Sequence, residues 1–153
     1  MKKLLMICSL LVIVASACRK DSSDDYPAQQ AIVDDNQIQA YISANKIVAT
    51  KDPSGVYYSI ITPGTGAYPT TSSTLSVNFK GEFINGTVFQ SDNLSNFKLD
   101  GVIKGWLYGI PHINTGGRIL LMIPSALAYG PQGRGTIPGN AVLVFTIDLL
   151  SIR

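Results

Sequence analysis

The chain of 153 residues is long enough for one hydrophobic core with an extension, and 46% of its residues are apolar against 14% charged. Without Lys2 and Lys3, which contribute to the formal charge of +2, the 12 basic residues become ten and balance the 10 acidic ones. Because Arg19-Lys20 is the only other basic pair, the composition gives no electrostatic support for binding nucleic acid.

Residues 1–17 have the pattern of a bacterial lipoprotein signal peptide. Lys2 and Lys3 form a positive start, an apolar run over 4–14 is too short to span a bilayer, and 15–17 are small. Cys18 follows directly, which resembles a lipobox with Ala15 in place of the usual Leu. We therefore predict that Cys18 is acylated and anchors the protein to a membrane. An ordinary signal peptide with an incidental cysteine is the alternative.

Residues 18–50 are predicted to form a lipidated tether followed by a short helix. Cys8 lies in the segment predicted to be removed, so the mature chain would have no disulfide and no thiolate metal site. The tether, 19–31, is polar, acidic and broken by Pro27. Acidic residues after an acylated cysteine resemble surface-export signals, although acidic linkers are commonly just solvated. We expect a protein of the bacterial cell envelope, lipid-anchored at the outer membrane, and surface-exposed if that signal operates.

A helix is predicted after Asp34-Asp35-Asn36, which supply N-cap candidates. Its apolar stripe contains Ile38, Tyr41 and Ile42, and the helix should end near Lys46. The stripe could dock on the following domain or serve for self-association. The sequence does not decide between the two.

From residue 51 the pattern changes to strands separated by turns. Asn85-Gly86 is a strong hairpin signal that returns through 87–89, and we interpret the triplets 85–87 and 93–95 as turns. The loop 62–66 lacks the ending of a phosphate-binding loop. With about five strands and no βαβ alternation, the sequence predicts an α+β domain with an antiparallel sheet. The other strands are expected over 56–61, 75–84, 118–123 and 141–150.

A short helix is predicted around the only tryptophan, Trp106. Ile103, Trp106 and Ile110 have helical spacing, and Pro111 limits the helix to about two turns. So short a helix must be held by packing, and the neighbouring strands suggest that it lies across the concave face of a sheet. Trp106 would then form the floor of a pocket. The alternative is that Trp106 is only a core residue.

Most familiar catalytic chemistry finds no support in the sequence. His112 is the only histidine, lies beside Pro111 in an expected loop and has no Cys or acidic cluster near it, so a metal site is not predicted. Glu82 and Asp148 lie in strands without a second carboxylate at a useful spacing. Ser125 lacks the context of a nucleophile. An enzyme built from this chain would work without covalent or general acid–base chemistry.

Four linked motifs resemble the FK506-binding-protein (FKBP) family of peptidyl-prolyl isomerases in order and spacing. They are residues 102–106, 116–118, 123–130 and 137–145. The resemblance covers about Gly55 to Ile152 and implies an isomerase domain over 51–153. Its fold would be an antiparallel half-barrel sheet wrapped around one short helix, with a proline pocket between them and no cofactor or metal.

The resemblance also implies the site residues. Tyr129, whose hydroxyl would donate to a bound carbonyl, Ile103, Phe89 and Trp106 would be catalytic. The substrate-binding residues would be Phe79, Gln90, Phe97, Val102, Ile137 and Phe145. Gln90 departs from the family, which usually has Asp there, and the Arg that often pairs with that Asp is missing. Phe79 lacks the hydroxyl of the Tyr often found there, and the loop 131–136 is slightly short.

The function implied is isomerisation of Xaa-Pro bonds in envelope or exported proteins, with FK506-like macrolides as inhibitors. A second hypothesis is a peptide-binding or chaperone lipoprotein with little turnover, because Gln90 replaces the acidic residue. A third is an adhesion or scaffold domain in which the pocket is only core.

Overall fold

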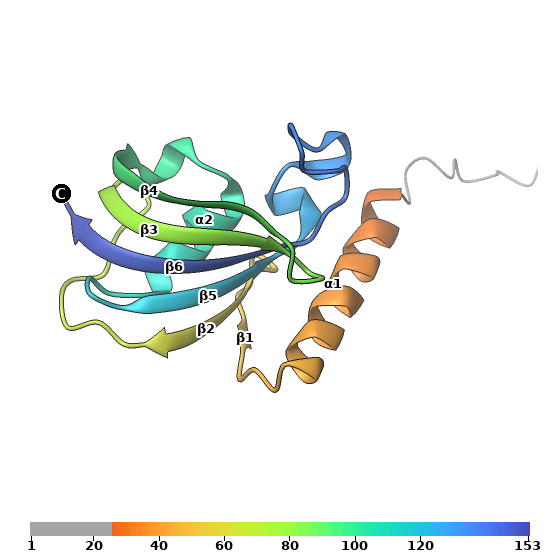
Figure 1. Cartoon of the computed structure of the whole chain (residues 1–153), viewed down its shortest axis with the longest axis horizontal. Coiled ribbons are helices and arrows are strands. Elements are labelled where there is room, and N and C mark those ends of the chain that lie inside the picture. Colours follow the sequence, from red (N-terminus) through yellow and green to blue (C-terminus); the bar gives the residue numbers. More distant parts are fainter. Residues whose placement is uncertain (1–25) are drawn as a thin grey trace, which may run out of the picture.

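One antiparallel sheet forms the body of the protein in a computed structural model that describes residues 26–153. The predictions on residues 1–25, including the signal peptide and the acylation of Cys18, lie outside the described residues. The strand order is β1-β2-β5-β6-β3-β4 (Figure 1). The strands are β1 (Thr50–Lys51), β2 (Tyr57–Thr62), β3 (Thr74–Phe83), β4 (Val88–Lys98), β5 (Arg118–Ile123) and β6 (Leu143–Ile152).

The sheet curves around the short helix α2 (Lys104–Gly109), which lies against one face (Figure 1). Register shifts interrupt the pairing of β3 with β4 and with β6, and such bulges increase the bend of a strand. The helix ends in a 3₁₀ turn, η2 (Ile110–His112), because Pro111 has no N–H to continue the hydrogen bonding. The predicted α+β fold, a half-barrel sheet around one short helix, is confirmed.

Strand β4 differs from its prediction, whereas β2, β3, β5 and β6 agree to within two residues at each end. The triplet Asn93–Ser95, interpreted as a turn, lies inside β4, so that interpretation is wrong. Asn93 Nδ2 donates to Asn78 Oδ1 of β3 at 2.8 Å. The strand was missed because it is a sheet edge, where polar side chains are common and apolar alternation is weak.

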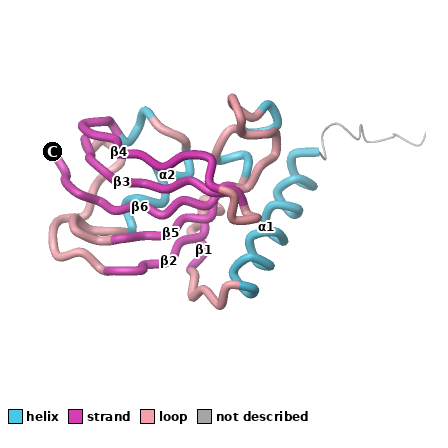
Figure 2. Tube along the Cα trace, in the orientation of Figure 1, coloured by secondary structure: helices cyan, strands magenta, loops and turns pink. Residues whose placement is uncertain are grey.

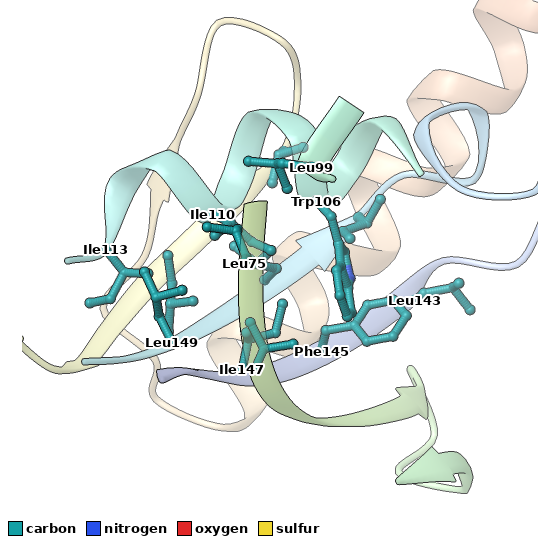
Figure 3. Close-up of a cluster of buried hydrophobic side chains, with 14 residues drawn as sticks. Leu75, Leu99, Trp106, Ile110, Ile113, Leu143, Phe145, Ile147 and Leu149 are labelled. Carbon is teal, nitrogen blue, oxygen red and sulfur yellow. The ribbon is translucent and has the colours of Figure 1, made fainter. Parts of the chain in front are cut away.

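Buried side chains form two clusters on opposite faces of the sheet. The larger lies between the sheet and α2 and includes Trp106, Leu121 and Phe145. Figure 3 shows Trp106 reaching from its helix toward Phe145 on β6. Since side chains alternate along a strand, Met122 and Val144 point the other way and form the second cluster.

The second cluster is covered by the long helix α1 (Tyr26–Ala44), seen beside the sheet in Figure 2. Ile38 is fully buried there, which shows that the helix docks on the domain. The predicted start at residues 34–36 is wrong, and residues 26–31 are helix rather than tether. Pro27 was taken as a breaker, but proline is tolerated in a first turn, where its missing N–H has no helical partner. None of the described helices has the length and apolarity to cross a membrane.

A contact between His112 and Asp52 connects the turn η2 to the turn before β2. His112 Nε2 lies 2.9 Å from Asp52 Oδ2, and its ring stacks on Tyr58 with the centroids 4.0 Å apart. Burial opposes the ionisation of Asp52, but hydrogen bonds from Ser54 and His112 outweigh it and lower the pKa of that carboxyl. His112 therefore joins η2 to the turn before β2.

Asp35 should stabilise the docked helix in a pH-dependent way. The Asp35 carboxylate accepts from Lys51 Nζ at 2.6 Å and from the Tyr57 hydroxyl at 2.7 Å, and these bonds lower its pKa below 3.8. When the pKa of a carboxyl is lower in the folded than in the unfolded protein, the carboxyl contributes to the free energy of unfolding. This contribution is complete above the pKa of the unfolded state and is lost as the pH falls through the pKa of the folded state. Because the pair is half exposed, Asp35→Asn should cost up to about 1 kcal/mol at pH 7.

Urea denaturation from neutral pH into the acid range measures this. The difference between the wild-type chain and Asp35→Asn should stay constant near neutral pH and shrink as the pH falls through the ordinary pKa range of an aspartate and below it. Asp100→Asn is the control, because Asp100 is exposed and makes no ion pair among residues 26–153. A difference that stays constant down to the acid limit would contradict the assignment.

Candidate active site

A pocket of ≈ 390 Å³ opens on the concave face above α2. Its size falls within the range of about 300–1,000 Å³ common for ligand sites. Aromatic and aliphatic side chains make up the interior, while polar and charged side chains lie along the β4 edge and the loop after β5. The lining residues are Phe79, Gln90, Asp92, Asn93, Leu94, Gly101, Val102, Ile103, Trp106, Tyr129, Arg134 and Phe145.

The floor of the pocket is a set of rings packed edge to face. Trp106 is 4% exposed and meets Phe79 and Phe145 in T-shaped contacts, with centroids 5.2 and 5.3 Å away. Such contacts favour one mutual orientation over others. The rings come from α2, β3 and β6, so the floor exists only when helix and sheet are assembled.

Two glycines allow this close packing. A Cβ on Gly81 of β3 would lie 2.5 Å from Phe89 and 2.9 Å from Phe145, so only glycine leaves space for both rings. A Cβ on Gly105 would collide with Ile123 of β5. Gly105 therefore lets α2 lie directly on the sheet and sets the depth of Trp106.

Most of the predicted site residues line the pocket. Seven of them do so: Phe79, Gln90, Val102, Ile103, Trp106, Tyr129 and Phe145. The other three are not among the lining residues. Phe89 packs on Phe145 at 5.7 Å, Phe97 on Trp106 at 6.0 Å, and Ile137 packs against the core. These three contact the lining rings or the core beside them.

Several lining residues were missed by the sequence prediction. Asp92, Asn93 and Leu94 were not expected there because β4 was taken to end near Phe89, and Gly101 and Arg134 were not predicted either. The register pairs Asp92 with Phe79, and paired residues of an antiparallel sheet point to the same face. Gln90, Asp92 and Leu94 are every second residue of the strand and so face the same side of the sheet, and this spacing could have identified them as lining residues.

Three residues of the pocket lining carry a hydrogen-bond donor without a partner among the residues that the structure describes. The Trp106 indole N–H is buried and has no acceptor, and the Ile103 backbone N–H and the Tyr129 hydroxyl make no hydrogen bond among residues 26–153. Ile103 directly precedes α2, where the first N–H groups of a helix have no internal partner. An unpaired buried donor is costly, about 1–3 kcal/mol, unless a ligand satisfies it.

The side chain of Arg134 packs against the ring of Tyr129. The Arg134 guanidinium lies 5.7 Å from the ring centroid, within the range of a cation–π contact. Arg134 and Ile137 also exchange two backbone hydrogen bonds of 2.9 Å, which close the loop around Tyr129. Arg134 therefore lines the pocket and steadies its hydroxyl-bearing side chain.

A second hollow of ≈ 460 Å³ lies on the outer face of the sheet, but its chemistry differs. The Arg118 guanidinium donates to both Asp148 oxygens there, at 2.6 and 2.9 Å. Arg118 and Asp148 are therefore paired with each other, and the lining of this hollow is mostly polar. No three His, Cys, Asp or Glu side chains gather as a metal site in the described part of the chain.

A family model described as FKBP-type peptidyl-prolyl cis-trans isomerase matches residues 66–150. The chain belongs to this family. FkpA of Escherichia coli K12, an FKBP-type peptidyl-prolyl cis-trans isomerase, is 42% identical over 103 residues, covering 65% of this chain and 38% of FkpA. The outer membrane protein MIP of Legionella longbeachae is 39% identical over 123 residues, covering 74% of this chain and 52% of MIP.

Solved structures of FKBP-type proteins share the fold. The crystal structure of FkpA from Escherichia coli superposes with a TM-score of 0.71 at 35% identity, covering 88% of this chain and 66% of that one. AtFKBP13 gives 0.62 at 31% identity, covering 69% and 99%. This chain spans 38% of FkpA and 52% of MIP, so it matches a part of these longer relatives.

Removing the floor of the FKBP-type pocket should destabilise the whole fold. Trp106→Ala should lower the free energy of unfolding by about 3–5 kcal/mol, because a large buried ring leaves a cavity. Urea denaturation followed by circular dichroism measures this. Tyr108→Ala changes a 38% exposed ring on the same helix and is the matched control. Equal losses for the two variants would show that Trp106 is not the packing centre.

Proposed function

We propose that this chain is a peptidyl-prolyl cis-trans isomerase that acts on Xaa-Pro bonds of envelope or exported proteins and assists their folding. The observation that carries the proposal is the apolar pocket over Trp106, whose lining residues Ile103 and Tyr129 have donors without partners within the described chain. Membership of the FKBP-type family and the names of FkpA and MIP support the same activity.

Such a pocket can accelerate the reaction without a base. Rotation about a peptide bond breaks its resonance, at a barrier of about 18–20 kcal/mol. For Xaa-Pro the planar forms are close in energy, so the barrier alone makes the uncatalysed reaction slow. The twisted form has less charge on its carbonyl and needs water less. A dry aromatic site therefore binds the twisted form better than either planar form, which lowers the barrier.

The proposed roles follow from where the residues lie. Trp106, Phe79 and Phe145 would hold the proline ring, and Val102 and Ile103 would pass along the peptide backbone. The Ile103 N–H and the Tyr129 hydroxyl would donate to its carbonyls. Phe89, Phe97 and Ile137 would act from outside the lining by keeping the rings in place. Each 1.4 kcal/mol of preference for the twisted form gives about a tenfold rate increase.

The proposal includes the organisation of the whole chain. Residues 1–17 would be a lipoprotein signal peptide, 18–50 a tether acylated at Cys18 followed by α1, and 51–153 the isomerase domain. The name of MIP, an outer membrane protein, supports a place in the cell envelope. FK506-like macrolides would compete for the pocket because they would fill the same apolar space.

The direct test is isomerisation of an Xaa-Pro peptide by the full chain, with and without FK506. Catalysis above the uncatalysed rate that FK506 abolishes is the expected result. Binding of FK506 without catalysis would instead favour a peptide-binding or chaperone lipoprotein. If the chain neither binds FK506 nor catalyses the isomerisation, the proposal that the pocket is a binding site is rejected.

The Tyr129 hydroxyl should contribute through one hydrogen bond in the twisted state. A single neutral hydrogen bond is worth about 0.5–1.5 kcal/mol, so Tyr129→Phe should lower kcat/KM about 3- to 10-fold. Tyr108→Phe removes an equivalent hydroxyl from the outer side of α2 and should have no effect. An unchanged kcat/KM in Tyr129→Phe would remove the hydroxyl from the mechanism.

The alternative of a weakly active binder rests on Gln90. Asp92 places a carboxylate on the same pocket face two residues further along β4, which argues against that alternative. The isomerase proposal therefore expects Gln90→Asp to change kcat/KM by less than about twofold, or under about 0.5 kcal/mol. Peptide isomerisation measured at equal protein concentration is the readout. A rise of tenfold or more would favour the weakly active form.

A further inference from the structure

The helix α1 carries a buried carboxylate that neither the core nor the proposed mechanism uses. Asp34 is 1% exposed, in the middle of the helix. Burying a carboxylate is unfavourable unless hydrogen bonds replace its water. Its Oδ2 accepts from the Ser125 N–H at 2.8 Å and from the Ser125 hydroxyl at 2.6 Å, and its Oδ1 accepts from Gln30 at 2.7 Å.

Ser125 lies at a critical place in the chain. It begins the 3₁₀ turn η3 (Ser125–Leu127), which is separated from β5 by Pro124, and it is itself only 2% exposed. The first N–H groups of such a turn have no internal partner. Asp34 supplies that partner from a helix 91 positions earlier in the sequence. Figures 1 and 2 show the segment after β5 beside α1.

Hydrogen bonds continue from Ser125 to the pocket. The Ser125 carbonyl accepts from the Ala128 N–H at 3.0 Å, and the Pro124 carbonyl accepts from Leu127 at 2.9 Å. Tyr129 follows Ala128 directly and places its side chain in the pocket lining. The backbone position of Tyr129 is therefore set from the Ser125 end by a chain of bonds that starts at Asp34.

The helix itself does not depend on Asp34 to stay docked. Ile38 is fully buried against Met122 and Val144, and Asp35 bonds Lys51 and Tyr57. The burial of Ile38 holds α1 on the sheet even when one of the polar contacts is removed, and it makes the helix a firm support. Losing the Asp34 carboxylate would free the Ser125 turn while leaving the helix in place.

We infer that Asp34 is a positioning residue for isomerisation, through which α1 fixes the segment Ser125–Tyr129 and with it the Tyr129 hydroxyl. The inference rests on the proposed function for its effect on rate. It also makes a separate claim about the order of residues 125–129 that does not depend on activity. The helix is then a working part of the active site as well as a connection to the N-terminal segment.

The first step of the experiment uses the full chain and three variants. Asp34→Ala should lower kcat/KM on an Xaa-Pro peptide about 3- to 10-fold, and Asp34→Asn, which keeps one acceptor, should lose less. The matched control is Asp35→Ala, the neighbouring carboxylate on the same helix, which should stay within about twofold of the wild type. Amide hydrogen exchange under native conditions should become faster at Leu127 and Ala128 in Asp34→Ala and stay unchanged in Asp35→Ala.

A second step separates positioning from general stability. In a Tyr129→Phe background, Asp34→Ala should cause little further loss of kcat/KM, because both changes remove the same hydrogen bond to substrate. Equal fold losses in both backgrounds, or unchanged exchange at Ala128, would overturn the inference. If the wild-type chain has no isomerase activity, the proposed function fails, and the exchange data still decide whether Asp34 orders the turn.

Discussion

The contact of Trp106 with the Phe79 and Phe145 rings is the interaction on which the rest of the structure depends. It joins α2 to two neighbouring strands, and it forms the floor of the pocket at the same time. The helix is too short to be stable alone, so its packing on the sheet must hold it. The same rings therefore stabilise the fold and form the proposed site, so changes there should affect both.

The pocket owes its proposed chemistry to dryness and shape. Its interior is aromatic, its unpartnered donors are neutral, and its charged side chains, Asp92 and Arg134, are exposed. The only histidine of the chain is engaged with Asp52 away from the pocket lining. A reaction whose barrier is the loss of amide resonance needs no proton transfer, so this arrangement is sufficient for it.

Local sequence signals predicted the parts of the fold that they control. Pro111 set the end of α2, Asn85-Gly86 set the hairpin, and the motifs around Trp106 and Tyr129 identified the family. The errors have a common cause. Whether Pro27 begins or breaks a helix, and whether residues 93–95 form a turn or an edge strand, depends on partners far along the chain. The contact between Asp34 and Ser125 spans 91 positions and has no local signature.

The most direct test of the central claim is the pH dependence of kcat/KM, measured by NMR exchange on an Xaa-Pro peptide. If a dry aromatic pocket lowers the barrier without a base, kcat/KM should be flat between about pH 5.5 and 8.5, wherever the chain remains folded. FK506 should abolish the activity at every pH in that range. A bell-shaped profile that FK506 also abolishes would show that a titrating group drives the reaction, and would contradict the account.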